Sequence, residues 1–515
     1  MFGTHHPQAA NRTAPTTRTN NACGSCRFRK VKCSGSHPCT QCAHLGLTCA
    51  FAPPSVRRKN GARGALVQQL QRTAKTIPRN APIRPLSSSP EILPPPSQAT
   101  PYTAAFFLAL VPDYEQVVYP VNPIITADEI RAAVATMYTA VEDAALVYAF
   151  AAITMIFLQP SHTPAGDEGS RLADLMHRGL VAHRASETAS LNSSTSSTSS
   201  GLGELHVTVK RVMTCMFLDM AMLSTGLLDR GFVVLREAIA LLQTLKVTND
   251  TPPHERARCQ RLYWECFLHE RFLFVINSRR TAVLPPLRLG RPLLPDPTIP
   301  AHVHAGFGRL VDLFCIIDDT FIRYWGWSDN DDNNDSPGVA LTADWVEQKQ
   351  AALDAEERTT ASLLGSLTEL QHVDIFITRL WLRTLVWQLA LARGLLRSSP
   401  PESAHEGLSL HFPADRLSAQ LRGLVCRLDS AASIATHGSG ILQKLFEITT
   451  TIADVLALPA MSDRHDAAAR MDDFVFLVRF LFRFDKVRPN ERRYIGEKLA
   501  TLQEMYHYEA VEGEE

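Results

Sequence analysis

Six of the eleven cysteines of this 515-residue chain lie close together near the N-terminus, at Cys23, Cys26, Cys33, Cys39, Cys42 and Cys49. Their spacing repeats, because each half consists of a Cys-x-x-Cys pair followed by a lone cysteine. In such a pair the turn brings two sulfur atoms to one side of the backbone, where both can bind one metal ion. No other feature of the sequence constrains the N-terminal fold as strongly, and it predicts a metal-binding module.

Three cysteines per half are one ligand short of a tetrahedral zinc site, and neither half contains a suitably placed fourth ligand. If two of the six thiolates bridge, two zinc ions each receive four sulfur ligands. No coordination position then remains for water or substrate, and such closed sites are structural rather than catalytic. We therefore expect two zinc ions per chain, held by all six cysteines.

The competing interpretation is a disulfide framework, which would require an oxidising compartment. Residues 1–15 contain no apolar segment of the kind found in a secretory signal. The other five cysteines are scattered through apolar segments, where a free cysteine behaves as a small hydrophobic residue. Both observations favour zinc.

The cysteine stretch resembles the fungal binuclear zinc-cluster DNA-binding domain, the type found in yeast galactose and maltose regulators. The resemblance implies that Cys23 and Cys39 are the bridging ligands. Pro38, after His37, stands where the family carries a proline in the loop between the halves. Ser34 departs from the family pattern, in which an acidic residue commonly follows the third cysteine.

Charge is distributed unevenly along the chain, although the formal net charge is zero. Residues 1–80 contain 13 basic residues and no acidic residue, whereas the remainder contains 39 basic and 52 acidic residues. A basic N-terminal segment around a metal module is typical of a domain that binds a polyanion. Double-stranded DNA is therefore the expected partner.

The resemblance assigns roles to the basic residues between the second and third cysteines. Arg29 and Lys30 would read bases in the major groove, in CGG-like triplets, through guanine O6 and N7. The other DNA-contacting candidates would hold phosphates, and they are Arg27, Lys32, Arg57, Arg58 and Lys59.

The fold class predicted for the chain is mostly α, with a large all-helical regulatory domain after the zinc module. Periodic apolar positions interrupted by Pro, Gly or Ser predict helices over residues 108–121, 128–158, 171–188, 205–223, 228–247, 255–277, 345–397, 414–436, 441–457, 467–484 and 490–508. Residues 144–158 are apolar throughout but too short to span a bilayer, so we expect a buried core helix and no membrane association.

The predicted domain boundaries follow changes in composition. We expect a disordered tail over 1–21, the zinc module over 22–52, a basic and then Pro/Ser-rich linker over 53–101 with a short helix over 65–77, the helical domain over 102–500 with loops at 191–204 and 328–338, and an acidic tail over 501–515.

One helical segment, residues 262–276, is apolar nearly all round but contains three charged side chains. Glu265, Glu270 and Arg271 would need charge partners if they are buried. A catalytic site formed by Glu265, His269 and Glu270 is disfavoured, because adjacent residues diverge on a helix. We therefore expect no catalytic residue there.

A second resemblance covers the helical domain. Residues 119–123, 235–245, the segment around Trp264 and residues 374–387 look like the middle homology region of fungal zinc-cluster regulators, most similar to the maltose and sucrose utilisation activators. Residues 277–280, Asn-Ser-Arg-Arg, depart from the Asn-Gly-Arg-Pro form usual in that region.

Together these features predict a nuclear, sequence-specific transcription factor of RNA polymerase II genes that works with co-regulators or the transcription machinery. The controlled genes would serve carbohydrate utilisation or a secondary-metabolite cluster. The competing hypothesis is a zinc-binding protein adaptor without a DNA target. An enzyme is disfavoured, because the sequence contains no phosphate-binding glycine loop, His-Glu-x-x-His or Gly-x-Ser-x-Gly motif. The sequence leaves open whether the chain forms a homodimer and whether the helical domain binds a small effector.

Overall fold

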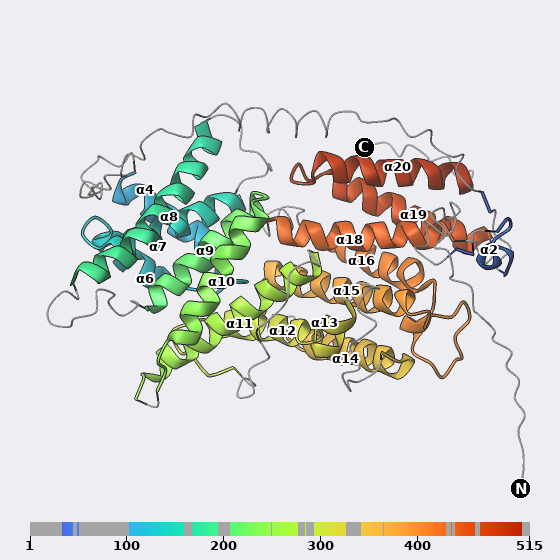
Figure 1. The fold of residues 1–515 in the computed structure, drawn as a ribbon, viewed down its shortest axis with the longest axis horizontal. Coiled ribbons are helices and arrows are strands. Elements are labelled where there is room, and N and C mark those ends of the chain that lie inside the picture. The colour runs from blue at the N-terminus through green and yellow to red at the C-terminus, as the bar shows by residue number, and fades with distance from the viewer. Residues whose placement is uncertain are drawn as a thin grey trace, which may run out of the picture. The chain divides into compact units, whose positions relative to one another are not determined.

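A computed structural model describes residues 33–34, 36–44, 49–50, 102–158, 167–193, 207–248, 250–276, 284, 293–325, 341–363, 365–428, 434, 438–458 and 464–506 (Figure 1). The chain divides into two compact units, Met1–Leu93 and Pro94–Glu515. Several predicted features lie outside the described residues, namely the tail over 1–21, the linker with its helix over 65–77, the departure at 277–280 and the loop over 328–338.

The mostly-α prediction is confirmed, because the described part of the second unit consists of helices joined by turns. The α-helices are α4 (Ala104–Ala109), α5 (Val111–Val117), α6 (Ala127–Thr136), α7 (Val141–Leu158), α8 (Asp167–Ser193), α9 (Val209–Ser224), α10 (Leu228–Thr244), α11 (Pro253–Ile276), α12 (Ala301–Phe314), α13 (Asp319–Trp325), α14 (Ala343–Ala361), α15 (Glu369–Ala392), α16 (Ser418–Val425), α18 (Gly438–Leu456), α19 (Arg464–Phe482) and α20 (Pro489–Tyr506). Two short turns, η1 (Glu406–Leu408) and η2 (Pro413–Leu417), follow α15.

Helix α7 is the buried core helix that its apolar sequence predicts. It packs against α5, α6, α8 and α9, and its side chains are buried on every face. Both α7 and α15 are long and apolar enough to cross a membrane, but most of each is buried against other helices of the protein. A helix that is hydrophobic all round is expected inside a large bundle.

Three predicted helices are interrupted by turns. The segment 108–121 breaks at Leu110, and Pro112 then lies in the first turn of α5. The segment 128–158 breaks after Thr136, whose hydroxyl donates to the carboxylate of Asp143 at 2.7 Å across the turn. The segment 345–397 breaks before Thr368, which starts α15 by exchanging hydrogen bonds with Gln371. Such a capping box satisfies backbone groups that the first turn would leave unpaired.

Three other regions differ from the prediction. The segment 414–436 leaves the helix at Cys426, and most of residues 429–436 lie outside the described part of the chain. Helices α12 and α13, over 301–325, lie where no helix was predicted. Helix α8 continues to Ser193, into the predicted loop over 191–204, whereas α20, which ends at Tyr506, agrees with the helix predicted over 490–508.

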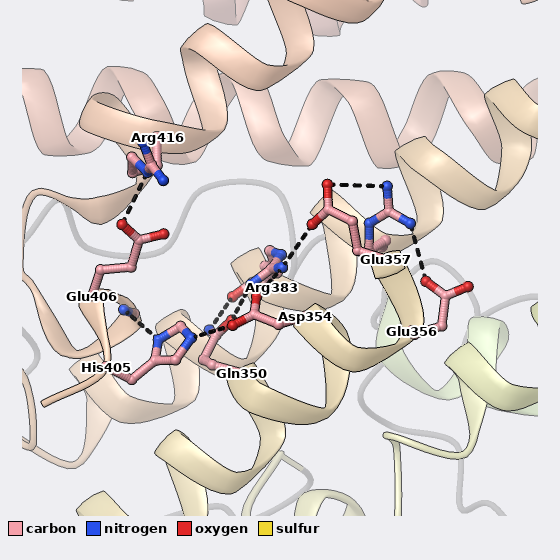
Figure 2. A network of polar contacts seen from close by, with 10 residues as sticks. Gln350, Asp354, Glu356, Glu357, Arg383, His405, Glu406 and Arg416 are labelled. Carbon is pink, nitrogen blue, oxygen red and sulfur yellow. Dashed lines mark hydrogen bonds and ion pairs between the residues drawn. The ribbon is translucent and has the colours of Figure 1, made fainter. Parts of the chain in front are cut away.

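Ion pairs between buried arginines of α15 and carboxylates of α14 join the two helices (Figure 2). Arg383 contacts Asp354 at 2.5 Å and Glu357 at 3.2 Å, and Arg379 contacts Glu356 at 3.0 Å. His405, after α15, contacts the second oxygen of Asp354 at 3.0 Å. The two arginine side chains are almost fully buried, so this seam fixes how α15 lies against α14.

Two of the three charged residues predicted to need partners in the segment 262–276 find them among the described residues. Glu270 pairs with Arg236 and, at 3.1 Å, with Arg271, and it accepts from the backbone of Leu284 at 2.8 Å. Neither carboxylate oxygen of Glu265 has a hydrogen-bond partner. The expected charge partners are therefore confirmed for Glu270 and Arg271 but not for Glu265.

Candidate metal centre

Four of the six clustered cysteines lie in the described part of the first unit, and all four are buried. Cys39 and Cys42 are fully inaccessible, and Cys33 and Cys49 are nearly so. The sulfur atoms of Cys39, Cys42 and Cys49 lie within 4.8 Å of one another. Three thiols from three points of the sequence therefore converge on one small volume.

A short helix, α2 (Thr40–His44), places two of these sulfurs. Cys39 immediately precedes α2 and its carbonyl accepts from the backbone of Ala43 at 2.8 Å. The side chain of Ser34 accepts from the backbone N–H of Thr40 at 3.0 Å, at the start of α2. Ser34, where an acidic residue is usual in the resembling family, thus still forms a local hydrogen bond that holds the helix start.

Backbone amides point at two of the sulfurs. The N–H of Cys39 donates to Cys49 Sγ at 3.2 Å, and the N–H of Cys42 donates to Cys39 Sγ at 3.4 Å. Amide donors stabilise negative charge on an acceptor, and a metal-bound cysteine is a thiolate.

The arrangement fits zinc. Sulfur atoms that bind one tetrahedral zinc ion at the usual Zn–S length lie about 3.8 Å apart. The sulfur atoms of Cys39, Cys42 and Cys49, which lie within 4.8 Å of one another, are close enough to share one ion. Zinc bound there would cross-link segments that have too small a core of their own.

The remaining predicted site residues lie outside the described part of the chain. They are the ligands Cys23 and Cys26 and the DNA-contacting candidates Arg27, Arg29, Lys30, Lys32, Arg57, Arg58 and Lys59.

A second group of metal-ligand residue types lies in the helical unit and was not predicted from the sequence. His183 of α8, Cys215 of α9 and Glu237 of α10 bring their ligand atoms within 4.8 Å of one another. His183 Nε2 lies 2.6 Å from Glu237 and 3.4 Å from Cys215 Sγ, and Arg211 contacts the same carboxylate oxygen at 3.4 Å. Burial raises the pKa of the Cys215 thiol well above its ordinary value, so the neutral thiol is favoured. We interpret this group as a hydrogen-bonded polar cluster that joins three helices.

Sequence comparison identifies the cysteine module. Residues 21–59 match the family described as the Fungal Zn(2)-Cys(6) binuclear cluster domain, which confirms the resemblance inferred from the cysteine spacing. The family description and the cluster of buried thiols agree on a zinc-binding module.

The similarity to known proteins covers either about half of this chain or only a short segment of it. The probable sucrose utilization protein SUC1 of Candida albicans is 24% identical over 282 residues, which cover 52% of this chain and 51% of that protein. The maltose fermentation regulatory protein MAL13 of Saccharomyces cerevisiae is 36% identical over 66 residues, 13% of this chain and 14% of that protein. The fumonisin cluster-specific transcription factor FUM21 of Gibberella moniliformis is 35% identical over 69 residues, 13% of this chain and 10% of that protein.

The chain thus spans about half the length of the sucrose utilization protein that it matches and much less of the other two. An alignment of 282 residues is longer than the whole first unit, Met1–Leu93, so this similarity extends into the helical unit.

Proposed function

We propose that this chain, whose residues 21–59 match a binuclear zinc-cluster domain, is a nuclear, sequence-specific transcription factor of fungal RNA polymerase II genes. The observation that carries the proposal is the convergence of buried cysteine thiols in that module, three of them within 4.8 Å of one another. A zinc site closed by sulfur stabilises a small fold without performing chemistry, so the module is a binding domain rather than an active centre.

Two zinc ions per chain would be held by Cys23, Cys26, Cys33, Cys39, Cys42 and Cys49, with Cys23 and Cys39 as bridges. The buried Cys39 sulfur lies close to those of Cys42 and Cys49, which supports one ion shared by these three cysteines, and the bridging role of Cys39 follows from the resemblance. Zinc supplies the cross-link, and the cysteines fix the segment 27–32 beside it.

The basic segment after Cys26 would then contact DNA. Arg29 and Lys30 read CGG-like triplets in the major groove, while Arg27, Lys32, Arg57, Arg58 and Lys59 neutralise phosphates. The basic excess of the first 80 residues supports this assignment, since a polyanion attracts such a segment.

The controlled genes would form a metabolic set. The named relatives are a probable sucrose utilization protein, a maltose fermentation regulatory protein and a fumonisin cluster-specific transcription factor. Because the similarity to the sucrose utilization protein extends beyond the zinc module, carbohydrate utilisation is the first pathway to test and a secondary-metabolite cluster the second.

The deciding experiment measures binding of the zinc-loaded full chain to duplexes that contain CGG triplets, by gel shift, against duplexes in which the triplet is scrambled. We expect a specific complex that is lost with a strong chelator and restored by zinc. Equal binding to both duplexes, with the zinc content intact, would instead support the zinc-binding adaptor without a DNA target. Transcript profiling of a deletion strain would then identify the gene set.

A further inference from the structure

A cavity of about 150 Å³ lies in the helical unit and is lined by residues of α9, α11, α12, α15 and α18. Its wall is largely apolar and includes the side chains of Phe157, Met220, Leu268, Phe272, Leu310 and Phe314. A cavity of this size can hold a benzene-sized molecule.

One carboxylate in this wall has no partner among the described residues. Glu265, on α11, is 1% exposed, and neither of its side-chain oxygens forms a hydrogen bond with them. Buried polar groups in folded proteins nearly always have a partner, because a buried unpaired group costs free energy. A buried polar group that lacks a partner and faces a cavity is therefore a candidate for ligand recognition.

The other charges at the cavity are already paired. Lys444 donates to Thr378 at 2.7 Å and lies 3.4 Å from the carboxylate of Asp374. His269, one turn after Glu265, contacts Asp219 at 2.7 Å. Each of these pairs balances its own charge, so none of them supplies Glu265 with a hydrogen bond.

The nearest arginine on the same helix is also engaged. Arg261, one turn before Glu265, contacts Asp296 at 2.8 Å and donates to the carbonyl of Pro123 at 2.7 Å. Burial raises the pKa of Glu265 to about 7, although the nearby charges of His269 and Arg261 act to lower it. A bound group that donates hydrogen bonds and carries positive charge would favour the ionised carboxylate.

We propose that this cavity binds a small organic amine, whose protonated nitrogen donates to Glu265 and whose apolar body packs among the phenylalanines. A charged donor forms stronger hydrogen bonds with a carboxylate than a neutral hydroxyl does, particularly away from water. An anionic ligand would meet the unpaired charge of Glu265 and be rejected. The site belongs to the helical unit, so the proposal does not depend on DNA binding by the zinc module.

Benzylamine is a suitable probe, with benzyl alcohol and benzoate as probes of nearly the same shape but different charge. Binding of each to the zinc-loaded full chain is measured at neutral pH by titration calorimetry and by the shift in melting temperature. We expect benzylamine to bind at least tenfold more tightly than the other two and to raise the melting temperature.

Two variants locate the site. Glu265→Gln keeps the shape of the side chain but removes its charge, and should weaken benzylamine binding at least tenfold. Gly440→Leu should block binding by occupying the cavity, because a Cβ at Gly440 lies 4.0 Å from Phe272 Cζ, an ordinary contact distance. Gly440→Ala should retain binding.

The matched control is Glu447→Gln on α18. Glu447 is another carboxylate in the interior, but it accepts from the indole N–H of Trp381 at 2.7 Å and does not line the cavity. This variant should bind benzylamine like the wild type.

Three results would overturn the proposal: equal affinity for benzylamine and benzyl alcohol, equal benzylamine affinity in the wild type and Glu265→Gln, or no binding of any probe at millimolar concentration. The last result would mean that the cavity holds only water. Because the gel shift is measured separately, failure here is distinguishable from failure of the proposed DNA-binding function.

Discussion

At the scale of single residues, Glu265 should make the stability of the helical unit depend on pH. Its pKa rises from 4.5 to about 7 on folding, chiefly through burial, so the folded state favours the protonated form. The stability associated with this proton is fully present below about pH 4.5 and is lost as pH rises through 7.

We therefore predict that Glu265→Gln gains stability relative to the wild type as pH increases from 5 to 8, by up to about 3 kcal/mol. Urea unfolding of both proteins at several pH values measures this difference. The variant Glu115→Gln, at an exposed position, should follow the wild-type pH profile. A difference between Glu265→Gln and the wild type that stays constant with pH would contradict the assignment.

Cys39 permits a second test at the residue scale. If its sulfur bridges both ions, Cys39→Ser should lower the zinc content of the full chain from about two ions to fewer than one, because both sites lose a ligand. Elemental analysis of purified protein measures the zinc content. Cys426→Ser is the control, since Cys426 is an exposed free thiol in the helical unit. Loss of a single ion would show that Cys39 is a terminal ligand.

At the scale of elements, ion pairs with buried arginines join α14 to α15, and an exposed ion pair joins η1 to η2 (Figure 2). Arg383 is 3% exposed in its side chain and balances Asp354 and Glu357. Arg416 pairs with Glu406 at 2.9 Å, but both side chains are about half exposed. Removal of a buried cation leaves the carboxylates that it contacts without their counter-charge, whereas water can replace an exposed cation.

We predict that Arg383→Ala lowers the free energy of unfolding by about 3 kcal/mol and that Arg416→Ala changes it by less than about 1 kcal/mol. Chemical unfolding monitored by circular dichroism compares the two variants with the wild type. Equal effects of the two substitutions would mean that the burial of Arg383 does not determine its contribution to the free energy of unfolding.

Element boundaries show where sequence reasoning succeeded and where it did not. Helix α10 was predicted well, because its apolar residues recur on one face, whereas α15 was fused to α14 although Thr368 and Gln371 carry the spacing of a capping box. Helices α12 and α13 were missed between proline-rich and acidic stretches. The pairing of Glu270 with Arg236 and the lack of a partner for Glu265 depend on contacts between helices, which periodicity does not reveal.

At the scale of the whole molecule, cysteine spacing was sufficient to predict the metal module, because the ligand chemistry of zinc restricts which spacings can close a site. The cavity beside Glu265 could not be predicted in the same way. Its walls come from helices that are far apart in the sequence, and only the packed helical unit brings them together.

The whole-chain charge asymmetry leads to the last prediction, which separates base reading from phosphate binding. Lys30 lies between Cys26 and Cys33, two of the proposed zinc ligands, so Lys30→Ala should cost about 1 to 3 kcal/mol in discrimination between CGG-containing and scrambled duplexes. Arg58 follows the module, so Arg58→Ala should weaken binding to both duplexes equally and reduce the salt dependence by a slope of about one. Affinities of the full-length variants across a salt series measure both effects. If each variant lowers the affinities for the CGG-containing and the scrambled duplex in equal proportion, Lys30 binds phosphate and not a base. The basic N-terminal segment would then attract DNA without reading its sequence through Lys30.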